Sequence, residues 1–147
     1  MVIRANYLVV FLLLFSVGGV STPRTTFDKY STHKPNPDVM VLAKLIESEC
    51  GVCPDYEKRL VGQVVLNRVK HPNFKNTLKS VIHAPNQFYY NKAIKPSKSS
   101  IKAAKTILKA NRTTKILYFY NPRTATDSTF IKSVNVLQMG KYHYFCA

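Results

Sequence analysis

Two stretches of sequence decide the fold: residues 42–49, LAKLIESE, and residues 54–69, PDYEKRLVGQVVLNRV. In the first stretch, apolar residues recur three and four positions apart, which is the spacing of one helix face. The second stretch is too apolar to be left exposed, which predicts a central buried helix. We therefore expect a helix over residues 39–50 with Asp38 as its N-cap, and a longer helix over residues 54–69.

The rest of the chain is typical of helices followed by strands. We expect a short helical turn at residues 78–82, a third helix at 97–110, strands at 117–120 and 142–146, and a polar loop at 123–129. At 147 residues the chain is long enough for one modest domain. This order predicts an α+β fold, a compact helical domain with a small antiparallel sheet at one end.

The N-terminal segment differs in composition from the rest. Arg4 precedes a nearly unbroken apolar run at residues 7–20, which predicts a secretory signal peptide over residues 1–21. The alternative is an uncleaved membrane anchor, but the run is shorter than the about 20 residues that span a bilayer. Residues 22–37 are rich in Thr, Ser and Pro and predict a flexible leader, so we expect the folded domain over residues 38–147. The protein is then exported to the periplasm, cell wall or extracellular space, and it contacts a membrane only through the signal peptide.

The chain is strongly basic, with 22 Lys and Arg against 7 Asp and Glu and a formal net charge of +15. Such a protein favours polyanions, which include nucleic acid, anionic lipid and acidic cell-wall polymers. Charge alone does not choose among these partners, but export favours the cell-wall polymer over nucleic acid. The lysines are spread along the chain, which indicates a generally cationic surface.

The three cysteines are Cys50, Cys53 and Cys146, and their odd number leaves at least one unpaired in a monomer. The Cys-x-x-Cys of Cys50 and Cys53 allows a structural disulfide, in this turn or to Cys146, a redox motif, or a metal site. The chain has no second Cys-x-x-Cys, and its four histidines are scattered without ligand spacing. We therefore expect a disulfide, no metal and no other cofactor.

Glu49 is the candidate catalytic acid. At about 100° per residue it falls near the middle of the apolar stripe of the first helix, while Glu47 projects toward solvent. Burial and a place in the last helical turn both disfavour the carboxylate, so both raise the pKa of Glu49. A carboxyl group that is protonated near neutral pH is what a general acid for glycosidic cleavage requires. The alternative is that the helix ends one turn earlier and Glu49 caps a loop.

Six short motifs occur in order between residues 41 and 145. They are LAKLIESE at 42–49, VVLNRV at 64–69, NFKNT at 73–77, VI with QF at 81–88, LYFYNP at 117–122 and GKYHYF at 140–145. Together these motifs resemble those of the SleB/CwlJ cell wall hydrolase family, whose founding members are spore-cortex-lytic enzymes. The first two are similar to the family's L-A-x-x-I-x-x-E helix and the V-V-L-N-R-V that follows it.

The resemblance implies a peptidoglycan-lytic enzyme with a lysozyme-like or transglycosylase-like α+β fold. It implies a single catalytic glutamate, which the motif places at Glu49. By motif position, Gln87, Tyr118, Asn121 and His143 line the substrate groove, although a purely structural role for His143 stays open. The expected partner is the glycan strand of peptidoglycan, and the expected state is a monomer.

The turn after Glu49 departs from the family pattern. Many members have a small-residue turn that ends in Glu-Pro, whereas here a cysteine follows Glu49 directly and Cys53 precedes the proline. This change puts a second carboxylate beside Glu49 in doubt. Asp55 and Glu57 are close in sequence, but both lie in the first turn of the next helix, where capping explains them.

A single carboxyl group favours a lytic transglycosylase, because glycoside hydrolysis normally uses two. Glu49 would protonate the bridging oxygen of the MurNAc–GlcNAc β-1,4 bond, and the muramic 6-hydroxyl would attack to give a 1,6-anhydro product. The first alternative is muramidase-type hydrolysis of the same bond by water. Others are a non-catalytic basic protein that binds wall polymer or nucleic acid, and an amidase that uses Cys50 or Cys53 with His143.

Overall fold

The computed structural model describes residues 36–147. The predicted signal peptide, and the predicted leader up to residue 35, lie outside the described residues. Among the helices of residues 36–147, none combines the length and the apolar character that crossing a bilayer requires.

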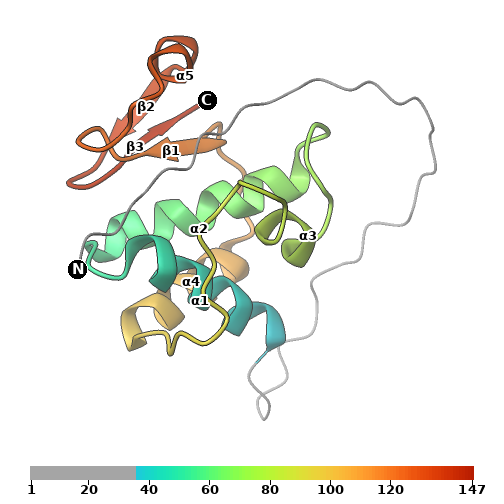
Figure 1. Cartoon of the computed structure of the whole chain (residues 1–147). Coiled ribbons are helices and arrows are strands. Elements are labelled where there is room, and N and C mark those ends of the chain that lie inside the picture. The colour runs from blue at the N-terminus through green and yellow to red at the C-terminus, as the bar shows by residue number, and fades with distance from the viewer. Residues whose placement is uncertain (1–35) are drawn as a thin grey trace.

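The described chain forms five helices and three strands. They are α1 Pro37–Cys50, α2 Asp55–Lys70, α3 Leu78–Ile82, α4 Lys98–Ala110, β1 Tyr118–Tyr120, α5 Ser128–Ser133, β2 Val136–Met139 and β3 Tyr144–Cys146. Figure 1 shows α1, α2 and α4 packed together, with the sheet at one end of this helical group. The predicted α+β class and its arrangement are confirmed.

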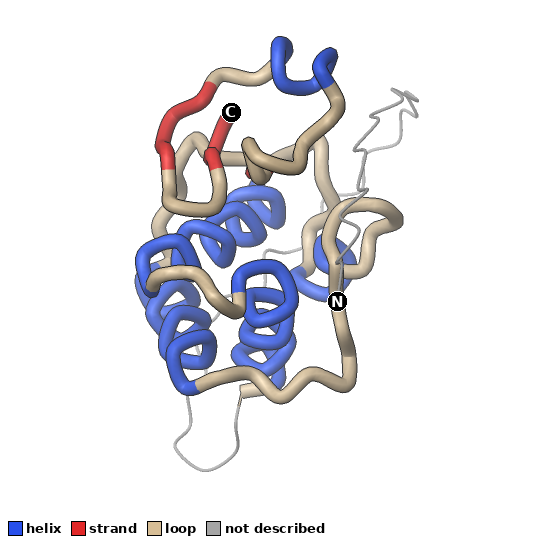
Figure 2. The backbone as a smooth tube through the Cα atoms, turned by 60° about the vertical axis from the view of Figure 1, so that its left-hand side comes forward, coloured by secondary structure: helices blue, strands red, loops and turns tan. Residues whose placement is uncertain are grey.

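The sheet is antiparallel, with the strand order β1-β3-β2. Tyr118 of β1 faces Cys146 of β3, and the last strand therefore lies in the middle. Figure 2 shows the strands and α5 gathered at the same end of the molecule as the C-terminus. The aromatic run of β1 is thereby placed between the helices and the rest of the sheet.

The core lies where α1, α2 and α4 meet. Leu42 and Ile46 of α1 and Val61 and Val65 of α2 are all 0% exposed, as the apolar periodicity predicts. A Cβ added to Gly62 would lie 3.2 Å from Ile46 Cδ1, so this glycine lets α2 approach α1 closely. The second helix is the central buried helix that the sequence predicts.

The start of α1 differs from the prediction. The N-cap is Asn36, whose side chain accepts a hydrogen bond of 2.9 Å from the backbone N–H of Asp38. Pro37 follows in the first helical position, where a proline is favoured because its missing N–H has no helical partner. The predicted cap, Asp38, lies inside the helix instead.

The expected solvent-facing position of Glu47 is also wrong. Its Oε2 accepts hydrogen bonds from the backbone N–H of Ser97 at 3.0 Å and from the hydroxyl groups of Ser97 and Ser100 at 2.6 Å each. These donors lie at the N-terminus of α4, where free N–H groups and the helix dipole favour an anion. Glu47 therefore joins α1 to α4.

The segment after β1 contains two elements that the sequence analysis missed. Asp127, in the predicted loop of residues 123–129, caps α5 by accepting the N–H groups of Thr129 and Phe130, and α5 continues beyond that loop. Strand β2 is mostly exposed, so it lacks the alternation of apolar and polar residues that marks a half-buried strand.

Candidate active site

Glu49 lies in the last turn of α1 and is half-buried. Its Oε1 accepts a hydrogen bond of 2.5 Å from the backbone N–H of Tyr89, in the loop before α4. Burial raises the pKa of Glu49 to about 7, against the Tyr89 hydrogen bond and the positive charge of Arg68, which both lower it. The carboxyl group is thus fixed in place and still holds its proton near neutral pH.

Arg68 of α2 is the buried cation near this acid, at 3% exposed. Its Nε donates to the carbonyl oxygen of Leu117 at 2.7 Å, and its Nη1 donates to Gln87 Oε1 at 3.1 Å. Its guanidinium carbon lies 4.7–5.3 Å from the ring centres of Phe74, Phe88 and Tyr118. Two oxygens and three rings therefore fix the guanidinium group, as a planar donor allows.

Burial lowers the pKa of Arg68 to about 10, while the nearby Tyr118 and Glu49 raise it. The group is therefore cationic at neutral pH and stabilises the carboxylate form of Glu49 once the proton has left. Arg68 is not among the site residues predicted from the sequence. The sequence feature that could have identified it is a charged side chain in a helix that is otherwise predicted to be buried.

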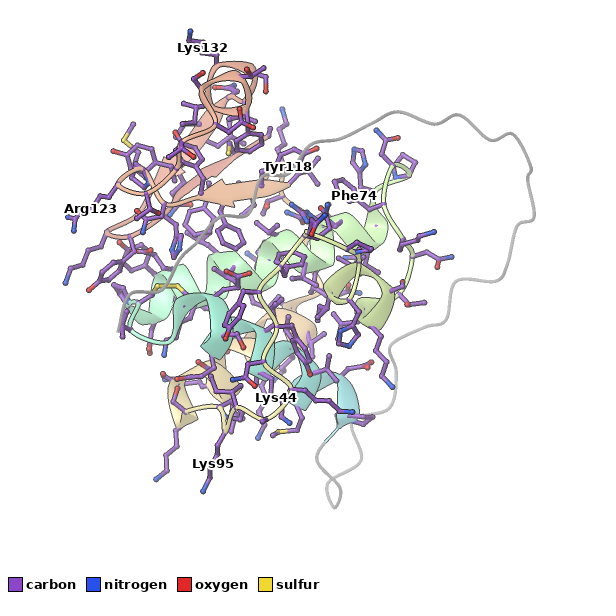
Figure 3. All side chains as sticks on the ribbon, in the orientation of Figure 1. Lys44, Phe74, Lys95, Tyr118, Arg123 and Lys132 are labelled. Carbon is purple, nitrogen blue, oxygen red and sulfur yellow. A yellow bond between two sulfur atoms is a disulfide. The ribbon has the colours of Figure 1, made fainter. Side chains whose placement is uncertain are left out.

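Two of the predicted groove residues meet at Arg68. Gln87 accepts its Nη1 hydrogen bond, and the half-buried ring of Tyr118 lies beside its guanidinium group. Figure 3 shows Tyr118 and Phe74 pointing toward each other near one end of α2, and their ring centres are 6.2 Å apart. Segments from α2, the loop before α4 and β1 therefore converge next to Glu49.

The other two predicted groove residues make contacts that do not involve Arg68. The side chain of Asn121 accepts the backbone N–H of Arg123 at 2.9 Å, which stabilises the turn after β1. His143 is 8% exposed, and its Nδ1 lies 3.2 Å from Glu57 Oε2. Burial lowers the pKa of His143, although Glu57 opposes this. These contacts support the structural alternative for His143.

Glu57 also differs from its predicted role as a helix-capping residue. It is 0% exposed and does not cap α2; its carboxylate accepts the backbone N–H groups of Lys141, Tyr142 and His143. A Cβ on Gly140 would lie 2.6 Å from Glu57 Cδ, so the turn between β2 and β3 needs glycine there. Glu57 therefore anchors the sheet to α2, while Asp55 stays exposed in the first turn.

Cys50 and Cys53 form a disulfide of 2.07 Å, and Cys146 is a free, buried thiol. Of the two pairings that the sequence left open, within the turn or to Cys146, the structure has the one within the turn, and Figure 3 draws it as a yellow bond. As a disulfide, neither sulfur is a nucleophile, so the oxidised protein does not offer the Cys–His pair that the amidase alternative needs.

Two shallow hollows flank the Arg68 site. One is lined by Ile82, His83, Ala84, Phe88, Tyr89 and Tyr90. The other is lined by residues 69–72 and 74–76. Neither hollow includes Glu49, but Tyr89, whose N–H binds Glu49, belongs to the first.

The fold is a small α+β domain, and the half-buried carboxyl group of Glu49 at the end of α1 is its candidate acid. The chain belongs to the Cell Wall Hydrolase family, whose sequence profile matches residues 54–146. The matched region begins after Glu49, so the choice of Glu49 rests on its environment and on the motif of α1.

The similar proteins agree with this family. A spore cortex-lytic enzyme of Bacillus cereus is 28% identical over 138 residues, which cover 88% of this chain and 53% of the relative. The chain thus spans about half the length of the curated relatives it matches.

Two solved structures share the fold. The catalytic domain of the Bacillus cereus SleB protein matches with a TM-score of 0.68 and 27% identity, over 75% of this chain and 89% of that domain. The catalytic domain of the germination-specific lytic transglycosylase SleB from Bacillus anthracis matches with a TM-score of 0.64 and 25% identity, over 81% and 99%. The resemblance inferred from the motifs is confirmed.

Proposed function

We propose that the protein degrades peptidoglycan as a lytic transglycosylase that cleaves the MurNAc–GlcNAc β-1,4 bond, with Glu49 as its catalytic residue. The observation that carries this proposal is the half-buried Glu49 carboxyl group, held by Tyr89 and near the charge of Arg68. Family membership supports the substrate, since the relatives with a printed activity are a cortex-lytic enzyme and a lytic transglycosylase.

The reaction needs one group that first gives and then takes a proton. Glu49 protonates the bridging oxygen as the bond to the muramic C1 breaks, and the resulting carboxylate then removes the proton of the muramic 6-hydroxyl. The hydroxyl oxygen bonds to C1, which closes the 1,6-anhydro ring and leaves Glu49 protonated again. A pKa of about 7 is suited to both steps near neutral pH.

The neighbouring carboxylates support a mechanism with a single acid. Glu47 is engaged by the serines of α4, and Glu57 is engaged by the turn before β3. A hydrolytic mechanism needs a second carboxyl group to act as nucleophile or base. Hydrolysis by water with Glu49 alone is therefore the second candidate.

Side chains near Glu49 offer contacts that a sugar can use. Tyr89 is 44% exposed, and Gln87 and Tyr118 lie around Arg68. An exposed aromatic face can stack on a sugar ring, and the Gln87 amide can bind an N-acetyl group. Arg68 acts through Glu49, because its charge stabilises the carboxylate between the two proton transfers.

The expected surroundings of the enzyme follow from this substrate. We propose export through the signal peptide of residues 1–21, action as a monomer on glycan strands, and no nucleic-acid partner. Figure 3 supports a general cationic surface: Lys132 and Arg123 project from the sheet end, and Lys95 projects from the opposite, helical end. A dedicated nucleic-acid site would concentrate these charges on one face.

The test compares the wild type with Glu49→Gln on purified sacculi, following the release of soluble glycan. A matched control is Asp55→Asn, which makes the same change at an exposed position. We expect Glu49→Gln to lose about 10²–10⁴-fold in rate and Asp55→Asn to keep its rate. A protein that only binds wall polymer would release no glycan in any form, and equal rates in all three would contradict the role of Glu49.

A further inference from the structure

Four side chains of types that bind metal ions meet between the end of α1, the start of α2 and the turn before β3. They are Cys50, Cys53, Glu57 and His143. Each offers one ligand atom, these atoms all lie within 4.8 Å of one another, and all four residues are buried. The proposed reaction at Glu49 uses none of them.

The distances in this cluster are close to those of a tetrahedral zinc site. His143 Nδ1 lies 3.8 Å from each sulfur and 3.2 Å from Glu57 Oε2. With bonds of about 2.3 Å to sulfur and about 2.1 Å to nitrogen and oxygen, tetrahedral ligand atoms are about 3.4–3.8 Å apart. The two sulfurs are bonded to each other, so the disulfide has to be reduced before both can bind one ion.

Hydrogen bonds already hold the carboxylate of Glu57 in position within the cluster. The carboxylate of Glu57 is oriented by the backbone N–H groups of Lys141, Tyr142 and His143, and Tyr56 donates to its Oε1 at 3.1 Å. Its Oε2, which accepts the N–H groups of Tyr142 and His143, also faces the imidazole of His143. Hydrogen bonds that hold a ligand in position are typical of metal sites, where they contribute to affinity.

The disulfide alone does not account for the cluster. It joins residues only three positions apart, and so short a loop gains less entropic stabilisation from a cross-link than a long one does. It also needs neither the histidine nor the glutamate. A metal ion would instead join Cys50 to His143, across 93 positions of sequence.

We propose that, after reduction of the Cys50–Cys53 disulfide, Cys50, Cys53, Glu57 and His143 form a tetrahedral zinc site. The Cys-x-x-Cys spacing is the usual one for zinc, and the fold supplies the two ligands that the sequence analysis could not find. A dithiol reductant transfers two electrons and two protons to the disulfide and becomes a disulfide itself. Binding of Zn²⁺ then releases the two thiol protons. This proposal is independent of the proposed catalytic function.

The experiment titrates the full chain, reduced under anaerobic conditions and freed of reductant, with Co²⁺ and then with Zn²⁺. We expect one equivalent of Co²⁺ to produce the intense visible bands of tetrahedral cobalt and a thiolate charge-transfer band, and Zn²⁺ to remove both. The oxidised protein should give neither. Binding of less than one equivalent, or equal binding by oxidised protein, would overturn the proposal.

X-ray absorption of the wild-type zinc form is a second measurement that needs no variant. It should give two sulfur and two nitrogen or oxygen neighbours around zinc. Three sulfurs, or none, would contradict the assignment.

Variants then test each ligand. Cys53→Ser and His143→Ala should weaken zinc binding by more than the about 10–100-fold that an outer-shell change causes, and Glu57→Gln should weaken it as well. The matched control is Cys146→Ser, which removes the buried thiol outside the cluster and should leave the titration unchanged. If Cys146→Ser abolishes the charge-transfer band, the site lies elsewhere. Circular dichroism of each variant before titration shows whether it is folded.

Discussion

The backbone N–H of Tyr89 donates a 2.5 Å hydrogen bond to Glu49 Oε1 and so joins two residues forty positions apart. The bond favours the charged form of Glu49, yet burial outweighs it, and the pKa is about 7. Glu49 is therefore held in one orientation without losing its proton. This combination is what a group needs to act first as an acid and then as a base.

The pH dependence of the rate should report this carboxyl group. Because Glu49 must be protonated to begin the reaction, the rate should fall above a pH of about 7, by about tenfold per pH unit. The measurement is the initial rate of glycan release from sacculi over a range of pH at constant ionic strength. A rate that stays constant well above pH 7 would show that Glu49 is not the acid.

Replacement of Arg68 should change the pH at which the rate begins to fall, here called the alkaline limb. Arg68→Gln removes the positive charge that lowers the pKa of Glu49, so the limb should shift to higher pH. Arg68→Lys keeps the charge and should leave the limb in place, although the ammonium group cannot reproduce the two hydrogen bonds and the ring contacts. The initial rate of glycan release is measured against pH for both variants, as for the wild type. Equal shifts in the two would contradict an electrostatic role.

The raised pKa of Glu49 also predicts a pH-dependent stability. The folded protein binds this proton more tightly than the unfolded chain, so the contribution of the group is complete below pH 4.5 and is lost as pH rises to about 7. Glu49→Gln cannot lose a proton, so its free energy of unfolding relative to wild type should rise by about 1–3 kcal/mol between about pH 4.5 and about pH 8. Urea denaturation at both pH values measures this difference. The exposed Asp55→Asn is the control, and a difference independent of pH would count against burial of the Glu49 carboxyl group.

The contact between Gly140 and Glu57 should limit substitution. Gly140→Ala places a methyl group 2.6 Å from Glu57 Cδ, and the carboxylate cannot move because three backbone N–H groups hold it. We expect a loss of about 1–3 kcal/mol in the free energy of unfolding. In a Glu57→Ala background the same change should cost less, because the clash is gone. Additive effects in a double-mutant cycle would show that the two residues are not coupled.

The helices and the candidate acid could be predicted because their signals are local. The spacing of Leu42, Leu45 and Ile46 gives the buried face of α1, and Glu49 follows on the same face. The strand at Tyr118 is marked by its aromatic run. Where the prediction failed, as at Asp38, two neighbouring residues offered a better cap.

The rest of the site depends on contacts between distant residues. Glu57 and His143 are 86 positions apart, and no periodicity links them. The role of Arg68 arises from rings and oxygens on three other segments, which only the fold brings together. Glu47 was misplaced because helix geometry shows its direction but not that the N-terminus of α4 lies there.

The central claim, that Glu49 alone drives an intramolecular cleavage, is tested most directly by mass spectrometry of the muropeptides released from sacculi. The products should end in 1,6-anhydro-muramic acid, one water lighter than the hydrolytic product, and Glu49→Gln should release almost none. Products with reducing muramic ends would contradict the transglycosylase mechanism. Anhydro products formed by Glu49→Gln at the wild-type rate would contradict the assignment of the acid.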